Sequence, residues 1–318
     1  MNGTTVRLVL NRVGVGMLTL LAVSVVIFTI TSLLPGDAAQ AALGQEATPE
    51  LVAALRAKLG LDLPAHVCYL HWLGGLLTGH PGVAMANGLP VTELIGGRLP
   101  NSLMLAAATT VVSVPLALAL GILSAMYRGS LFDRVVSVAT VWTVSVPEFL
   151  IATLAVLLFA VKLRWLSALS HTDDIATFGQ FMRAYALPVM TLCCGIVAQM
   201  ARMTRAAVID QLNASYVEMA RLKGVRPVRM VLSHALPNAI GPIANAVALS
   251  LSYLIGGVII IESIFNYPGI ASLMVDSVTM RDMPVVQACA MLFCAGYLIL
   301  VTAADLCGIV ANPRLRHR

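Results

Sequence analysis

The sequence predicts an all-α integral membrane protein with about six membrane-spanning helices in a single domain. Of its 318 residues, 59% are hydrophobic and only 11% are charged, whereas about 25% of an ordinary soluble domain is charged. This number of charged residues is too small to cover the surface of a water-soluble protein of this length. Lipid must therefore surround much of the chain. Long uncharged stretches also recur, each long enough to cross about 30 Å of hydrocarbon as a helix.

Charged residues mark the ends of these apolar stretches. The six expected spans are residues 13–34, 99–127, 135–161, 184–201, 230–261 and 283–304. The fourth is the shortest, and the aliphatic stem of Arg202 would extend it toward the membrane surface. No repeat or flexible linker interrupts the chain, so residues 1–318 are expected to form one transmembrane domain. Two longer connections remain, an extracytoplasmic loop at 35–100 and a cytoplasmic loop at 206–236.

The distribution of basic residues predicts the orientation. With both termini in the cytoplasm, most of the 20 Lys and Arg residues fall on the cytoplasmic side, as the positive-inside rule requires. The net charge of +5 is thereby explained by topology, and membrane lipid rather than nucleic acid is the expected contact. Five of the six cysteines lie in apolar runs, without the spacing of a metal site, so no metal ligands are expected.

The extracytoplasmic loop contains one clear helix signal, at residues 49–59. Thr48 is a candidate N-cap, Pro49 suits the first helical position and Gly60 suits the stop.

The cytoplasmic stretch 215–224 reads as a short helix with a defined end. Gly224 can adopt the left-handed conformation that closes a helix, and Pro227 cannot continue it. Pro227 in turn suits the start of a second short helix running to Leu236. Two short helices at an angle would form a compact cytoplasmic knob. An amphipathic loop lying on anionic lipid remains the alternative.

Glu148 is the most unusual residue within the expected spans. A straight helix would place it about 20 Å from Arg134, well inside the bilayer. A carboxylate there is costly unless it faces protein or water, and the adjacent Pro147 would loosen the backbone ladder. Two interpretations stay open: a carboxylate that lines a translocation pathway and meets a cationic group, or a structural Glu at a helix interface.

The cytoplasmic stretch resembles the "EAA" loop of ABC importer permeases. Glu218, Ala220, Gly224, Leu236 and Pro237 keep the spacing of that family pattern. The sequence departs from it at two positions, with Met219 in place of alanine and His234 in place of an aliphatic residue.

Further segments resemble the dipeptide, oligopeptide and nickel permeases of this family. They are Leu34-Pro-Gly-Asp37, Leu59-Gly-Leu-Asp-Leu-Pro64, Pro90-Val-Thr-Glu-Leu-Ile95, Glu262-Ser-Ile-Phe-Asn-Tyr-Pro-Gly269, Arg281-Asp-Met-Pro284 and Asn312-Pro-Arg314. Gly79-His-Pro-Gly82 replaces the usual G-D-x-G.

The resemblance implies a type I importer permease fold in the bacterial inner membrane. It implies a homologous second permease subunit, two ATPase subunits that bind ATP and Mg²⁺, and an extracytoplasmic substrate-binding protein. The chain itself carries no phosphate-binding loop G-x-x-x-x-G-K-[ST], so it is not expected to hydrolyse ATP or to hold a cofactor. The ATPase-coupling residues implied by the resemblance are Tyr216, Glu218, Ala220, Arg221, Gly224, Leu236 and Pro237.

Small peptides are the expected cargo, and half of the pathway would come from this chain. Nickel or another small solute, such as glutathione or an opine, is the alternative within the family, and His66, His71 and His80 cluster in the outer loop. An ion-coupled secondary carrier would need paired intramembrane charges or inverted repeats. A membrane-embedded enzyme would need a polar catalytic cluster. The sequence shows no paired intramembrane charges, no inverted repeat and no such cluster.

Overall fold

The computed structural model describes residues 3–33, 40, 47–59, 63–169 and 177–311. Leu34-Pro-Gly-Asp37, Gly60 and Asn312-Pro-Arg314 therefore lie outside the described residues. The described chain is helical, with no strand beyond an isolated bridge between Val83 and Pro90. The helices are α1 (Gly3–Ser32), α3 (Pro49–Leu59), α4 (Ala65–Leu77), α5 (Val91–Met126), α6 (Leu131–Ser145), α7 (Glu148–Ala155), α8 (Phe178–Leu212), α9 (Ser215–Leu222), α10 (Pro227–Arg229), α11 (Leu236–Ile264), α12 (Ile270–Thr279) and α13 (Met283–Ala311), with π-helical turns at Val156–Lys162 and Met230–Ala235.

Five of these helices are long and apolar enough to cross a membrane, and a bent pair makes a sixth candidate. This confirms the predicted all-α membrane fold. The helices extend past the predicted ends: α5 begins at Val91 rather than at 99, and α8 covers Phe178–Leu212 rather than 184–201. Charged side chains mark where hydrocarbon ends, but the backbone hydrogen bonds of a helix continue into the polar region.

The third predicted span, 135–161, is not one straight helix. α6 ends at Ser145, and the helix that begins at Glu148 runs at 100° to it. Val146 is extended, with φ −90° and ψ 128°, because the ring of Pro147 disfavours the helical conformation of the preceding residue. The straight-helix estimate of the depth of Glu148 was therefore wrong, since Glu148 lies just beyond a sharp bend.

The helix α8 forms the centre of the bundle. Its most apolar stretch is 61% buried, whereas that of α1 is only 6% buried. The main hydrophobic cluster joins α5, α7, α8 and α11 through side chains such as Leu105, Leu187 and Ile261. A Cβ at Gly121 of α5 would lie 2.7 Å from the carbonyl oxygen of Ala201, so α5 and α8 are in close backbone contact there. α8 is thus the element against which the other helices are positioned.

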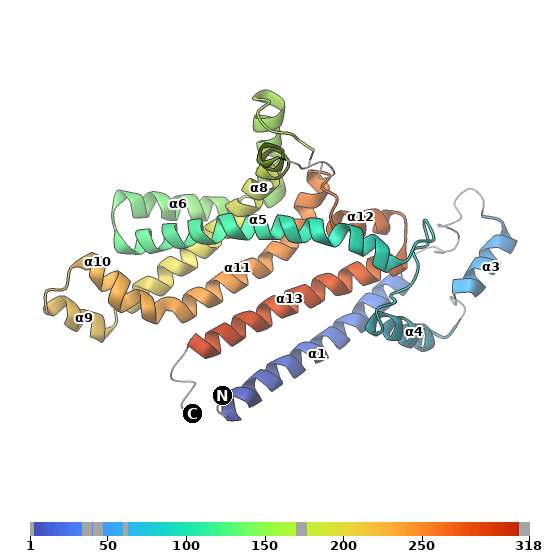
Figure 1. Cartoon of the computed structure of the whole chain (residues 1–318), viewed down its shortest axis with the longest axis horizontal. Helices are drawn as coiled ribbons and strands as arrows, with labels where there is room; N and C mark the ends of the chain where they lie inside the picture. Colours follow the sequence, from blue (N-terminus) through green and yellow to red (C-terminus); the bar gives the residue numbers. More distant parts are fainter. Residues whose placement is uncertain (1–2, 34–39, 41–46, 60–62, 170–176, 312–318) are drawn as a thin grey trace.

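The two ends of the bundle differ in what they carry. Figure 1 shows α9 and α10 toward the same end as the start of α1 and the end of α13, and α3, α4 and α12 toward the other. At the end that carries α3 and α4, the predicted helix Pro49–Leu59 is confirmed as α3, and the hydroxyl of Thr48 accepts a hydrogen bond from the Leu51 amide at 3.4 Å. The two long connecting regions therefore lie at opposite ends of the bundle.

Candidate functional site

The short helix α9 has one inward and one outward face. Val217 and Ala220 are buried against the rest of the chain, whereas Glu218, Met219 and Leu222 are exposed. The small side chain of Ala220 therefore lets α9 pack closely against the rest of its own chain. The outward face offers apolar and acidic side chains to a partner.

The end of α9 is the glycine-closed stop that the sequence predicted. The Gly224 amide donates to the carbonyl of Arg221 at 2.9 Å, and the Val225 amide donates to that of Ala220 at 3.2 Å. Together they form the hydrogen-bond pair of a Schellman motif. Gly224 has φ +78°, in the left-handed region that only glycine enters without strain. Nothing lies within 4 Å of where its Cβ would be, so the backbone is bare on this surface.

The second short helix expected at 227–236 is not separate. α10 continues through the π-helical turn Met230–Ala235 into α11, and residues Pro227–Ile264 run as one candidate span. The π turn immediately precedes Leu236 and Pro237. A wider turn there leaves more room for the ring of Pro237 than an α-helical turn would. Leu236 and Pro237 thus belong to the membrane helix rather than to a knob of two short helices.

A groove of about 700 Å³ opens beside the end of α9. Basic and aliphatic side chains both line it. The lining residues are Lys223, Gly224, Val225, Arg226, Val228, Arg229, Leu232 and Ser233. Such a surface suits a protein partner that presents carboxylates around an apolar contact.

The base of α9 is firmly joined to α8. Only Asn213 and Ala214 separate the two helices, and their amides donate to carbonyls in the last turn of α8. The phenol of Tyr216 donates to Oε1 of Gln211 at 2.9 Å. Arg221 is exposed in the last turn of α9, where a cation complements the helix dipole.

Glu148 occupies a narrow position between two glycines. It is the first residue of α7, after Pro147, and it is half-buried. A Cβ at Gly195 of α8 would lie 3.2 Å from Oε1 of Glu148, and a Cβ at Gly257 of α11 would lie 3.0 Å from Oε2. Among the described residues, no hydrogen-bond donor to this carboxylate is found. The carboxylate thus lies at the junction of α7, α8 and α11, where the described part of the chain offers it no hydrogen-bond partner.

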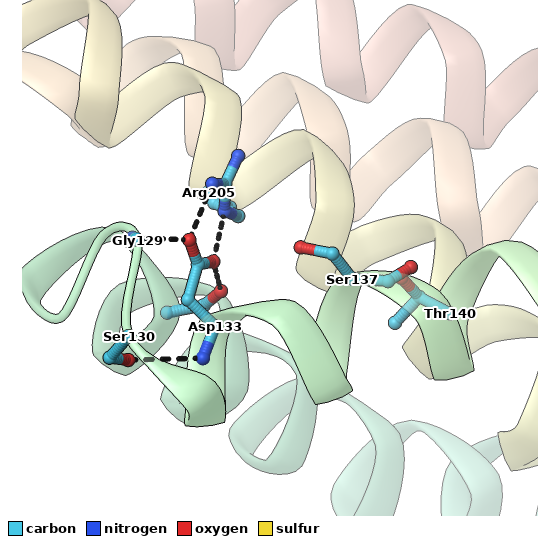
Figure 2. A network of polar contacts seen from close by, with 7 residues as sticks. Gly129, Ser130, Asp133, Ser137, Thr140 and Arg205 are labelled. Carbon is cyan, nitrogen blue, oxygen red and sulfur yellow. Dashed lines mark hydrogen bonds and ion pairs between the residues drawn. The ribbon is translucent and has the colours of Figure 1, made fainter.

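Two polar networks were not anticipated from the sequence. At the end of the bundle near α9, Asp133 of α6 pairs with Arg205 of α8 (Figure 2). At the opposite end, Glu262 of α11 accepts hydrogen bonds from Ser102 of α5 and from two amides of α12. Both acids follow or precede apolar runs in the sequence, but nothing local identifies their partners.

The outer histidines do not form a site within the described chain. His66 and His71 lie on α4, and Nδ1 of His80 lies 3.0 Å from the carbonyl oxygen of Thr78. Among the described residues, no group of three His, Cys, Asp or Glu side chains could hold a metal ion.

The family comparisons agree with this architecture. Residues 117–317 match the family described as "Binding-protein-dependent transport system inner membrane component", and residues 5–106 match its N-terminal companion. The chain belongs to this family: it is a multi-pass permease subunit of an ABC transporter in the bacterial inner membrane. Members of the family work with a substrate-binding protein and with ATPase subunits, which carry out the hydrolysis.

Curated relatives match over almost their whole length. The glutathione transport system permease protein GsiC of Salmonella choleraesuis is 36% identical over 300 residues, covering 94% of this chain and 95% of that protein. GsiC of an Escherichia coli O6:H1 strain is 35% identical with the same coverage. A probable peptide ABC transporter permease protein of Sinorhizobium fredii, y4tP, is 34% identical over 295 residues, covering 93% of this chain and 94% of that protein.

Proposed function

We propose that the chain forms half of a translocation pathway for small peptides. A homologous second permease subunit supplies the other half, two ATPase subunits dock at the α9 end, and a binding protein delivers cargo at the α12 end. Both termini face the cytoplasm. The relatives named for glutathione and for peptides favour this cargo class, since glutathione is itself a short peptide.

The coupling element is the surface formed by α9, Gly224 and the adjacent groove. Tyr216, Glu218 and Arg221 lie on it as exposed side chains, and bare backbone at Gly224 permits close approach of a partner. ATP binding draws the ATPases together, and this surface passes the movement into α8 and α11. Cargo moves because the two orientations of the bundle differ in their affinity for ATP and for cargo.

Glu148 and Pro147 belong to the pathway in this proposal. The observation that carries the assignment is the half-buried carboxylate between Gly195 and Gly257, to which no side chain or amide in the described part of the chain donates a hydrogen bond. A peptide presents an α-ammonium group that would satisfy this carboxylate, so Glu148 provides a transient contact for the amino terminus. Pro147 produces the bend that aims the first turn of α7 at the junction.

Uptake into proteoliposomes tests this assignment. The complex would be reconstituted with its binding protein and ATPases, and labelled dipeptide, glutathione and Ni²⁺ would be offered separately. We expect ATP-dependent uptake of a peptide, and a fall of about fivefold or more in Glu148→Gln, because an ion contact is lost. Glu93→Gln, at an exposed carboxylate near the start of α5, is the matched control.

Two outcomes would contradict the proposal. Uptake of Ni²⁺ with no uptake of either peptide would replace the cargo class by a metal ion. Unchanged peptide uptake by well-assembled Glu148→Gln complexes would remove Glu148 from the pathway and make it a structural side chain.

A further inference from the structure

Asp133 is a fully engaged buried carboxylate near the α9 end of the bundle. It is 4% exposed, and its two oxygens accept four hydrogen bonds. Nε and Nη2 of Arg205 donate at 2.7 and 2.9 Å, the Ser124 hydroxyl at 2.5 Å and the Gly129 amide at 2.9 Å. Figure 2 shows the guanidinium of Arg205 pointing toward the carboxylate of Asp133, with one dashed line to each carboxylate oxygen. This forked geometry fixes both the distance and the orientation of the two side chains.

These donors come from three different parts of the chain. Ser124 lies in the last turn of α5, Gly129 lies in the turn before α6, and Arg205 lies on α8. The hydroxyl of Ser130 also caps α6 by accepting a hydrogen bond from the Asp133 amide. One carboxylate therefore joins the α5–α6 turn to α8.

The rest of the interface between α6 and α8 is looser. A cavity of about 200 Å³ lies along it, lined by Ser124, Val136, Ser137, Thr140, Val141, Ala201, Arg202 and Arg205. Ser137 and Thr140 face this gap (Figure 2), and the hydroxyl of Thr140 donates to the carbonyl of Ser137 on its own helix at 3.0 Å. The opposite face of α6 is exposed at Val135, Val138 and Trp142. The ion pair is therefore the tight point by which α8 holds α6.

Each partner of this pair is connected to one of the functional regions. Arg205 precedes the end of α8 at Leu212 by about 10 Å of helix, and the short turn after Leu212 leads directly into α9. Asp133 lies in the first turn of α6, which ends at the Val146–Pro147 bend next to Glu148. The short turn and the ion pair thus form a continuous connection from α9 through α8 to α6.

We propose that Asp133 and Arg205 are positioning residues for transport: they couple the movement of α9 to α6 and hence to the bend that carries Glu148. The inference rests on the proposed function and adds the route between its two ends. In this role the two residues act through the helices and not through contact with cargo or ATP. Their effect is to make hydrolysis at the ATPases productive for transport.

The test measures cargo transported per ATP hydrolysed in the reconstituted full complex. Asp133→Asn keeps the shape of the side chain but loses the ionic fork. We expect it to retain ATPase binding and basal hydrolysis while transport per ATP falls about fivefold or more, a typical size for a coupling between sites. Arg205→Lys, which keeps the charge and loses the fork, is expected to show a smaller loss of the same kind.

A second ion pair of the chain supplies the matched control. Nη1 of Arg12 on α1 lies 2.9 Å from Oδ2 of Asp305 on α13, and both side chains are more exposed. Asp305→Asn removes an ion-paired carboxylate that lies away from the proposed route, and its transport per ATP should equal that of the wild type. The exchange Asp133→Arg with Arg205→Asp restores opposite charges and should recover part of the ratio.

The outcomes separate coupling from folding. A parallel loss of assembly, hydrolysis and uptake in Asp133→Asn and in Arg205→Lys would show a purely structural role and overturn the inference. An unchanged transport-to-hydrolysis ratio in both would also overturn it. In either case the proposed function stands if the wild-type complex takes up peptide with ATP, and it falls if the wild type does not.

Discussion

Gly257 on α11 lies directly against the carboxylate of Glu148 on α7. A Cβ at Gly257 would be 3.0 Å from Oε2 of Glu148 and 3.1 Å from Cδ2 of Leu192. The neighbouring Gly256 has nothing within 4 Å of its Cβ position. Of these two adjacent glycines on α11, only Gly257 therefore lies against the carboxylate of Glu148.

The pair Gly257→Ala and Gly256→Ala tests whether this space matters for transport. Gly256→Ala should leave uptake unchanged and add about 0.5–1 kcal/mol of helix stability. Gly257→Ala should displace Glu148 or Leu192, at a cost of about 1–3 kcal/mol for overpacking, and should lower uptake per assembled complex. Uptake is measured with labelled peptide after quantifying complex by size-exclusion chromatography. Equal uptake by the two variants would show that the position of Glu148 is not critical.

The buried Glu262 organises the end of the bundle opposite α9. Its carboxylate accepts from the Ser102 hydroxyl at 2.5 Å and from the amides of Ala271 and Ser272 at 2.8 and 3.2 Å. These two amides belong to the first turn of α12, where an acid also complements the helix dipole. A Cβ at Gly269 would overlap this carboxylate. Glu262 thus docks α12 onto α5 and α11.

Glu262→Ala should destabilise this end of the protein by about 2–4 kcal/mol, because it leaves buried donors without an acceptor. Faster hydrogen exchange of the α12 amides and a lower thermal midpoint of the purified complex would be the readouts. Asp276→Asn, at an exposed carboxyl on the same helix, should change neither. Unaltered α12 exchange in Glu262→Ala would contradict the docking role.

Pro147 determines the bend between α6 and α7. In Pro147→Ala, the helical conformation of Val146 is no longer disfavoured, so the two helices should spend more time as one straighter rod. Distances between spin labels placed on α6 and α7 should lengthen, and uptake should fall. Pro115→Ala is the control, since Pro115 lies inside the unbroken α5 and its removal should leave the course of that helix unchanged. Identical label distances in Pro147→Ala and wild type would show that tertiary packing alone maintains the bend.

The sequence predicted those elements whose signals are local. The membrane helices followed from apolar runs, α3 followed from Thr48 and Pro49, and the end of α9 followed from Gly224. Each depends on residues close together in the chain, so one sequence contains the necessary information.

The errors and omissions share a physical cause. The bend at Pro147 was missed because apolar residues continue through it. An apolar run indicates that a segment lies in lipid, but it does not indicate the direction of the helix axis. Asp133 and Arg205 are 72 residues apart, and Glu148 meets glycines from two later helices. Contacts of this kind depend on how the helices pack, which no short window of sequence contains.

The central claim is that the α9 surface joins this permease to its ATPases, and Gly224→Trp tests it most directly. Gly79→Trp is the matched control, because Gly79 has φ +79° against +78° for Gly224, and both Cβ positions are open. Each substitution costs similar backbone strain, about 1–2 kcal/mol, but Gly79 follows α4, at the other end of the bundle. Co-purification of the ATPase subunits and the hydrolysis they sustain would be measured for both variants. The account predicts that Gly224→Trp loses both while Gly79→Trp retains both. Full retention of bound, active ATPases by Gly224→Trp would contradict it.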